Sequence, residues 1–159
     1  MGRYGTGGLR PAWGEAPYPG HSPLMHYPWA QTQPVLDNLM RTDNGSQYDG
    51  VIMEYTNPVT GGPVMPTMGC YVQALKPMQH TEPHRHTGST IYHVIEGEGY
   101  SIVDGKGLEW SSKDTFCVPS WAVHEHVNGS SGSPAYLFSY SNAPVLKALY
   151  LYREEAVER

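Results

Sequence analysis

The stretch HRHTGSTIYHVIEGEG, residues 84–99, holds two histidines one residue apart, followed by an apolar run that ends in glycines. In an extended strand, side chains at positions i and i+2 point to the same face, so His84 and His86 would lie side by side. The run 91–96 has the length and the β-branched content of a strand, and its glycines mark a turn. This stretch therefore predicts β-structure that presents two imidazoles on one face.

A second histidine pair with the same spacing lies in KDTFCVPSWAVHEHVN, residues 113–128. His124 and His126 follow the first pair by about forty residues, which is room for several short strands and the tight turn at 104–107. A small barrel that folds one pair over the other would aim three or four imidazoles at one point. Neutral imidazole binds iron, copper, nickel and zinc, so the sequence predicts a metal site.

The composition favours an all-β domain. The chain has 159 residues, enough for one domain, and combines only 16% charged residues with 18 glycines and 14 prolines. Short apolar segments broken by glycine-containing turns are typical of a small antiparallel barrel or jelly roll. The strands are predicted near residues 51–55, 69–75, 91–96, 100–103, 115–118, 124–128 and 135–139.

The two ends of the chain differ from this central barrel, which we expect over residues 51–143. Residues 1–50 form an irregular arm rich in glycine, proline and aromatic residues, with a short helix predicted over 33–40. Its aromatic residues are costly to leave in water, so parts of the arm should wrap a surface; they are Trp13, Tyr18, Tyr27 and Trp29. Residues 144–159 are predicted to hold a C-terminal helix, from 145 to 157, with Pro144 in its first turn.

Several function classes are disfavoured. The formal net charge of −5 and the pI near 5.8 argue against nucleic acid or an anionic membrane as a partner. No stretch is long and apolar enough to span a bilayer, and residues 1–20 lack the apolar core of a signal peptide. Cys70 and Cys117 stand alone in apolar segments, so we expect buried free thiols in a cytoplasmic protein.

The histidine motifs resemble those of the cupin superfamily, whose double-stranded β-helix is a jelly-roll barrel. The flanking segments are similar to the gentisate 1,2-dioxygenase family, which includes the salicylate and 1-hydroxy-2-naphthoate dioxygenases. The resemblance covers roughly residues 20–157 and is carried by segments 48–51, 54–63, 66–68, 119–126 and 149–155.

This resemblance implies a metal centre and a reaction. His84, His86 and His124 correspond to the residues that bind Fe(II), or another divalent metal, in such barrels. Family members split a hydroxylated aromatic carboxylate such as gentisate with dioxygen. Many cupins supply a glutamate as fourth ligand, and that position is Thr90 here, so we expect a three-histidine site with no carboxylate. Such a centre would favour an anionic chelating substrate.

Three further residues are candidates for the site. His126 shares a face with His124, and we predict a catalytic role in hydrogen bonding or proton transfer to a bound hydroxyl. A strand histidine at the mouth of the barrel is the structural alternative. Tyr92 and Trp121 could line a substrate pocket together with His126, although aromatic residues at alternating positions are often plain core.

The resemblance also favours an alternative function. Family members usually carry two barrels in one chain, and this sequence is similar to the linker and the second barrel. An arginine that helps to hold the substrate in the first barrel is replaced by Tyr92. The alternative is thus a non-catalytic cupin module, the structural half of a two-barrel enzyme. A metal-dependent isomerase or a sugar-binding cupin fits less well. In either main case we expect a homo-oligomer whose N-terminal arms exchange.

Overall fold

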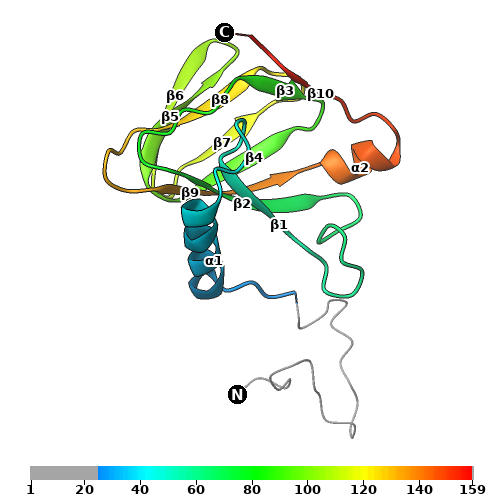
Figure 1. Cartoon of the computed structure of the whole chain (residues 1–159). Helices are drawn as coiled ribbons and strands as arrows, with labels where there is room; N and C mark the ends of the chain where they lie inside the picture. Colours follow the sequence, from blue (N-terminus) through cyan, green and yellow to red (C-terminus); the bar gives the residue numbers. More distant parts are fainter. Residues whose placement is uncertain (1–24, 159) are drawn as a thin grey trace, which may run out of the picture.

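The computed structural model describes residues 25–158 and has two five-stranded antiparallel sheets that face each other (Figure 1). The first sheet has the order β1 (Val51–Tyr55), β2 (Gly69–Leu75), β9 (Ala135–Ser141), β4 (Thr90–Glu96) and β7 (Thr115–Val118). The second has the order β10 (Glu154–Ala156), β3 (His84–His86), β8 (His124–Asn128), β5 (Glu98–Val103) and β6 (Lys106–Ser111). This is the predicted all-β jelly-roll barrel, with short helices added.

The core of the barrel follows from the alternation of side chains along its strands. In β4, Thr90, Tyr92 and Val94 are buried, whereas the intervening residues are only partly buried. Both sheets contribute to this core, which contains Leu75, Tyr92, Val94, Trp110, Val118, Ala122, Ala135 and Leu137. Apolar packing of these residues therefore fills the space between the two sheets in this part of the barrel.

Helix α1 (Trp29–Thr42) covers the outer face of the first sheet (Figure 1). Its Leu36 is fully buried in a second apolar cluster with Val51, Val72, Ala74 and Tyr136. This cover explains why β2 is buried on both faces. The helix predicted over 33–40 is confirmed and is longer than expected. No helix within residues 25–158 has the length and apolar character that a membrane crossing requires.

Part of the predicted arm packs on the barrel. The Trp29 ring meets the Tyr136 ring edge-on at 5.3 Å, and the Tyr27 and Tyr55 rings lie 5.0 Å apart. These contacts agree with the expectation that aromatic residues of the arm cover a surface. Trp13 and Tyr18 lie outside the described residues.

The seven strands predicted by range are confirmed, and the structure adds β3, which carries the first histidine pair in the expected extended form, as well as β6 and β10. The predicted turn at 104–107 is a two-residue hairpin turn in which Asp104 and Gly105 have φ of 47° and 75°, as a type I′ turn requires. Strand β6 therefore begins already at Lys106, and it was not predicted. Most of its residues are exposed, so it lacks the apolar alternation by which strands are recognised.

The predicted C-terminal helix over 145–157 is wrong in extent. Helix α2 covers only Ala143–Ala148, and Tyr150 then adopts a left-handed φ of 58°, which ends the helix. The chain returns as strand β10, which pairs with β3. Leu149, whose helical spacing from Val145 had suggested a longer helix, is 60% exposed, and the following Tyr150 and Leu151 are 95% and 56% exposed. The second sheet thus extends beyond residue 143, where the barrel was expected to end.

The two cysteines are free, as predicted, but they are not both buried. Cys70 is half-buried and Cys117 is exposed. Both lie on faces of the first sheet that point away from the barrel interior, since Cys117 pairs in register with Ile91 and Cys70 with Tyr140. Apolar neighbours in the sequence therefore gave a false indication of burial.

Gly99 provides a test of how closely β5 and β8 approach each other. A Cβ at this position would lie 2.0 Å from the Val127 carbonyl oxygen and 2.6 Å from the Trp110 ring. We expect Gly99→Ala to lower the free energy of unfolding by about 1–3 kcal/mol through overpacking. Gly107→Ala on the paired strand β6 is the matched control, because no atom lies within 4 Å of its Cβ. Equal urea midpoints for the two variants would contradict this packing.

Candidate metal centre

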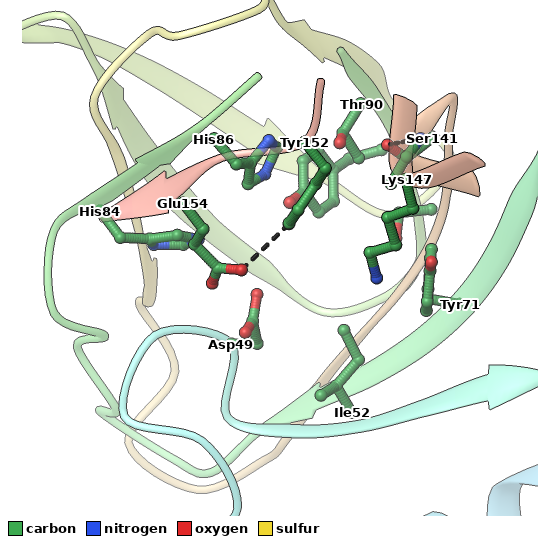
Figure 2. Close-up of a pocket in the computed structure, with 13 residues that line it drawn as sticks. Asp49, Ile52, Tyr71, His84, His86, Thr90, Ser141, Lys147, Tyr152 and Glu154 are labelled. Atoms are coloured by element: carbon green, nitrogen blue, oxygen red, sulfur yellow. Dashed lines mark hydrogen bonds between the residues drawn. The ribbon is translucent and has the colours of Figure 1, made fainter. Parts of the chain in front are cut away.

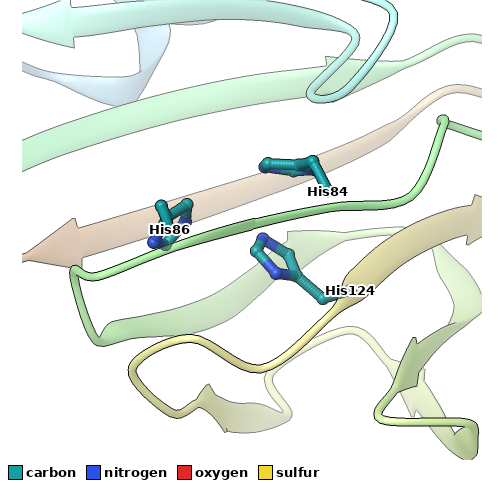
Figure 3. A group of neighbouring side chains, drawn as sticks. All are labelled: His84, His86 and His124. Carbon is teal, nitrogen blue, oxygen red and sulfur yellow. The ribbon is translucent and has the colours of Figure 1, made fainter. Parts of the chain in front are cut away.

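Three histidines from two neighbouring strands converge inside the barrel (Figure 3). His84 and His86 share a face of β3, and His124 of β8 is the register partner of His84. One possible ligand atom from each ring lies within 4.8 Å of the others. The ring centroids of His84 and His124 are 4.2 Å apart, and those of His86 and His124 are 4.9 Å apart. Cross-strand pairing thus brings together residues forty positions apart in the sequence.

The hydrogen bonds of these rings leave nitrogen lone pairs free. Nδ1 of His124 donates to the Ala122 carbonyl oxygen at 3.0 Å, and Nδ1 of His86 donates to the Gly88 carbonyl oxygen at 2.7 Å. A neutral ring that donates through Nδ1 carries its lone pair on Nε2. Within residues 25–158, the buried Nε2 of His124 and Nδ1 of His84 have no hydrogen-bond partner. Buried nitrogens without partners are costly, so this arrangement suits a metal ion.

Two of the three rings, those of His84 and His124, are held in the neutral form that a metal requires. Burial lowers the pKa of His124 to about 2, with a further contribution from the neighbouring His126 and His84. Burial also lowers the pKa of His84, although nearby Asp49 opposes this shift. Because neutral imidazoles bind a metal without first losing a proton, the site is prepared for a divalent cation at neutral pH.

A cavity of about 170 Å³ opens beside His84 and His86 (Figure 2). Hydroxyl groups from the first sheet and a lysine from α2 surround it, among them Thr90, Ser139, Ser141, Tyr71 and Lys147. Tyr92 lines its inner wall, as predicted, and Ile52 adds an apolar surface. The cavity therefore offers hydrogen-bonding groups of several kinds around the histidines.

Two carboxylates line the same cavity, which the sequence did not suggest. Asp49, in the loop before β1, is half-buried, and Glu154 of β10 lies exposed at the rim. Burial raises the pKa of Asp49, while His84, a hydrogen bond from Ser46 and His86 oppose the rise. Thr90 stands where a fourth glutamate ligand is common, and within the described residues the cluster of possible metal ligands contains only the three histidines; the two carboxylates lie near it in the cavity but outside the cluster.

His126 is fully buried behind the metal-site histidines. Its Nδ1 lies 2.7 Å from Ser101 Oγ, which accepts a hydrogen bond from Trp110 Nε1 at 3.0 Å. Its ring meets the Tyr92 ring edge-on at 4.7 Å, and burial lowers its pKa to about 3. Within the described chain its Nε2 has no partner. His126 is thus a neutral, firmly oriented ring that touches Tyr92 of the cavity wall but is not itself among the residues that line the cavity.

Trp121 lies outside the cavity beside the histidines. The Arg85 guanidinium stands over its ring at 4.6 Å from the centroid, and Arg85 points to the opposite face of β3 from His84 and His86. Trp121 is not among the residues that line the cavity. Trp121 is close to the second histidine motif in the sequence but not in the structure, because the turn before β8 directs its side chain outward.

Gln73 is a polar residue of the barrel interior that sequence reasoning missed. It is fully buried in β2, between Tyr71 of the cavity wall and Leu75 of the core. Neither atom of its side-chain amide has a hydrogen-bond partner within residues 25–158. A glutamine within an otherwise apolar strand was the available signal, since buried polar groups are normally paired.

Comparison with known proteins agrees with the fold and the histidine motifs. Residues 71–140 match the cupin domain family. The barrel has the cupin fold. The resemblance to the gentisate dioxygenase group is also confirmed, because the curated proteins similar to this chain carry names from that group.

Two curated relatives and one solved structure illustrate the similarity. The chain is 45% identical to a 5-aminosalicylate 1,2-dioxygenase from Comamonas sp over 144 residues, which is 90% of this chain and 38% of the relative. It is 35% identical to gentisate 1,2 dioxygenase 1 from Aquipseudomonas alcaligenes, covering 84% and 38%. Salicylate 1,2-dioxygenase from Pseudaminobacter salicylatoxidans superposes with a TM-score of 0.75 at 28% identity, covering 87% and 44%. The chain thus spans less than half of the length of each of these relatives.

Proposed function

We propose that this cupin barrel is an Fe(II)-dependent dioxygenase that opens the ring of a hydroxylated aromatic carboxylate. His84, His86 and His124 would hold the metal. The observation that carries this proposal is the convergence of three imidazoles, among which buried nitrogens lack partners, beside an open cavity. When bound, the metal would supply a Lewis-acidic and redox-active centre for the aromatic ring and dioxygen.

The cavity has groups that could orient such a substrate. Lys147 lies at the rim, where its Nζ stands over the Tyr152 ring at 4.8 Å from the centroid. We propose that Lys147 attracts the substrate carboxylate. Tyr92, which stands where related barrels have a substrate-binding arginine, carries no charge and cannot do so. Tyr92 would bound the ring on the inner side. Trp121 is left out of this substrate site because it stacks with Arg85 outside the cavity.

His126 would act on the proton of the substrate hydroxyl. Its ring is fixed by Ser101 on one side and contacts Tyr92 on the other. A neutral imidazole with an unpartnered nitrogen can accept or return a proton. Because His126 is fully buried and is not among the residues that line the cavity, this role would require Tyr92 to move aside so that the hydroxyl could reach the imidazole.

Lys147→Met is expected to weaken binding of gentisate by about fivefold, because an exposed ion pair contributes at most ~1 kcal/mol. The Michaelis constant should rise while kcat changes little, since the lysine would hold the carboxylate equally in the ground and transition states. Lys106→Met, on β6, is the matched control. An unchanged Michaelis constant in Lys147→Met would remove this residue from the substrate site.

The proposed reaction is tested by oxygen uptake. Protein purified without air and loaded with iron would be given gentisate, salicylate, 5-aminosalicylate or 1-hydroxy-2-naphthoate. We expect at least one to cause stoichiometric oxygen consumption and appearance of a ring-opened product in the ultraviolet spectrum. Iron-loaded protein that consumes no oxygen with any of them would reject the proposed activity.

The alternative function is a non-catalytic module of a two-barrel enzyme. It is favoured by the length, because the chain spans only 38% of the first relative, and by Tyr92 at the position of the substrate-binding arginine. In that case the barrel would stabilise a separate catalytic barrel. Metal binding without oxygen uptake, together with activation of a catalytic first barrel on mixing, would support this alternative.

Self-assembly is a further part of the proposal. Exposed apolar residues on the loop after α2, together with the N-terminal arm, give surfaces that another barrel could cover; they include Leu149, Tyr150 and Leu151. Because α1 packs on the first sheet, the deletion that tests arm exchange should remove residues 1–24 and leave α1 in place. Light scattering should then give the monomer mass. An unchanged oligomer mass would reject arm exchange.

A further inference from the structure

We propose that the C-terminal strand β10 completes the metal centre, with Glu154 and Asp49 as the carboxylates that bind the metal beside the three histidines. This inference rests on the metal site of the proposed function, but not on the reaction. It assigns a role to two acidic residues that approach the histidines from separate parts of the chain (Figure 2).

The pairing of β10 with β3 places Glu154 on the face of the histidines. Glu154 is the direct register partner of His86, and Ala156 is the partner of His84. Residues directly opposite each other in an antiparallel pair project to the same side of the sheet, with Cβ atoms about 5 Å apart. The carboxylate of Glu154 accepts a hydrogen bond from the Tyr152 hydroxyl at 3.0 Å, and both side chains line the cavity. Within the described residues neither of the two proposed carboxylates belongs to the cluster whose ligand atoms lie within 4.8 Å of one another, so the Glu154 side chain would have to turn toward the histidines to share a ligand with them.

Asp49 approaches from the opposite side of the cavity. Its Oδ2 accepts a hydrogen bond from Ser46 Oγ at 3.2 Å, and the ring of the adjacent Tyr48 lies 5.2 Å from the His84 ring. In Figure 2, its carboxylate points toward that of Glu154, beside His84. The loop before β1 therefore holds the carboxylate at the histidines rather than toward bulk water.

Two carboxylates in one small cavity repel each other unless a cation lies between them. Lys147 does not serve this purpose, because within residues 25–158 it forms no ion pair closer than 4.0 Å and its Nζ rests on the Tyr152 ring. A divalent cation at the histidines would compensate both negative charges. The unpartnered nitrogen of buried His84 lies in the wall of the same cavity, which points to the same ligand.

Strand β10 is anchored independently of Glu154, which makes the proposal testable. The neighbouring Glu155 points to the other face, where the Arg85 guanidinium donates to its carboxylate. The backbone N–H of Val157 donates to the Pro83 carbonyl, and that of Arg153 to Thr87 Oγ1. Removing the Glu154 charge should therefore leave the strand in place.

The test compares metal affinity in Glu154→Gln, Asp49→Asn and Glu155→Gln. The full chain would be titrated with Mn(II) and with Co(II) in competition with a chromophoric chelator, and folding would be checked by circular dichroism. We expect Glu154→Gln and Asp49→Asn each to raise the dissociation constant by about tenfold or more. Glu155→Gln, which has the same substitution on the same strand, should stay within about twofold. The d–d absorption of bound Co(II) should also change in Glu154→Gln.

The outcomes separate this inference from the proposed function. Wild-type affinity in a folded Glu154→Gln variant would overturn the role of β10, whereas the dioxygenase proposal would stand. Weakened binding in Glu155→Gln equal to that in Glu154→Gln would also overturn it, because strand attachment would then explain both. Weakened binding in Glu154→Gln and Asp49→Asn alone, with no oxygen uptake by the wild type, would support the five-residue site and reject the reaction.

Discussion

Replacing His124 with alanine is expected to remove the metal from the barrel and to lower substrate-dependent oxygen uptake by at least about 100-fold. His124 is fully buried at the centre of the cluster, within 4.9 Å of both partner rings by centroid distance. His84 and His86 alone share one short strand and cannot surround a cation. Metal content by plasma mass spectrometry and oxygen uptake by electrode would measure the two losses.

The control for this prediction is His93→Ala. His93 points away from the barrel, and its Nδ1 lies 3.0 Å from Thr115 Oγ1 on the outer face of the first sheet. This variant removes an imidazole from β4 without touching the cluster, so it should retain metal and activity. Metal retained at the wild-type stoichiometry in His124→Ala would show that the metal binds elsewhere.

The second large effect that we expect is a loss of stability when the apolar core between the sheets is truncated. Leu137 of β9 is fully buried and packs in the core with residues of both sheets. We expect Leu137→Ala to lower the free energy of unfolding by about 2–5 kcal/mol, because it removes apolar contacts and leaves a cavity. The measurement is urea unfolding followed by tryptophan fluorescence.

Leu149→Ala is the matched substitution for Leu137→Ala. Leu149 is 60% exposed on the loop after α2, so its truncation should change stability by less than about 0.5 kcal/mol. Similar losses in the two variants would mean that the core described between the sheets is not the main source of stability.

Much of the barrel could be predicted because its strands carry local signals. Strands β1, β2, β7 and β8 begin and end where the alternation and the turn residues place them. The histidine pairs could be recognised for the same reason, since i and i+2 must share a face once a strand is formed. The convergence of the two pairs carries no such local signal, because it depends on the pairing of β3 with β8.

The carboxylates of the cavity could not be predicted in this way. Asp49 lies in a loop, where no periodicity indicates the direction of a side chain. Glu154 lay in a segment whose residues Val145, Leu149 and Tyr152 have helical spacing, yet Tyr150 ends the helix and the rest pairs with β3. Such long-range pairing gives no local signal, so the approach of two carboxylates to the three-histidine cluster could not be foreseen. The choice of substrate therefore depends on the whole cavity, including these carboxylates and Lys147, and not on the histidines alone.

The most direct test of the metal centre is anomalous diffraction from crystals of the iron-loaded protein. Data collected above and below the iron absorption edge should give one strong anomalous peak among His84, His86 and His124, at the cavity that Asp49 and Glu154 line. The peak should be within bonding distance, about 2.0–2.2 Å, of one nitrogen from each ring. A fully iron-loaded protein whose anomalous peak lies elsewhere, or histidine rings that remain without metal, would contradict the account.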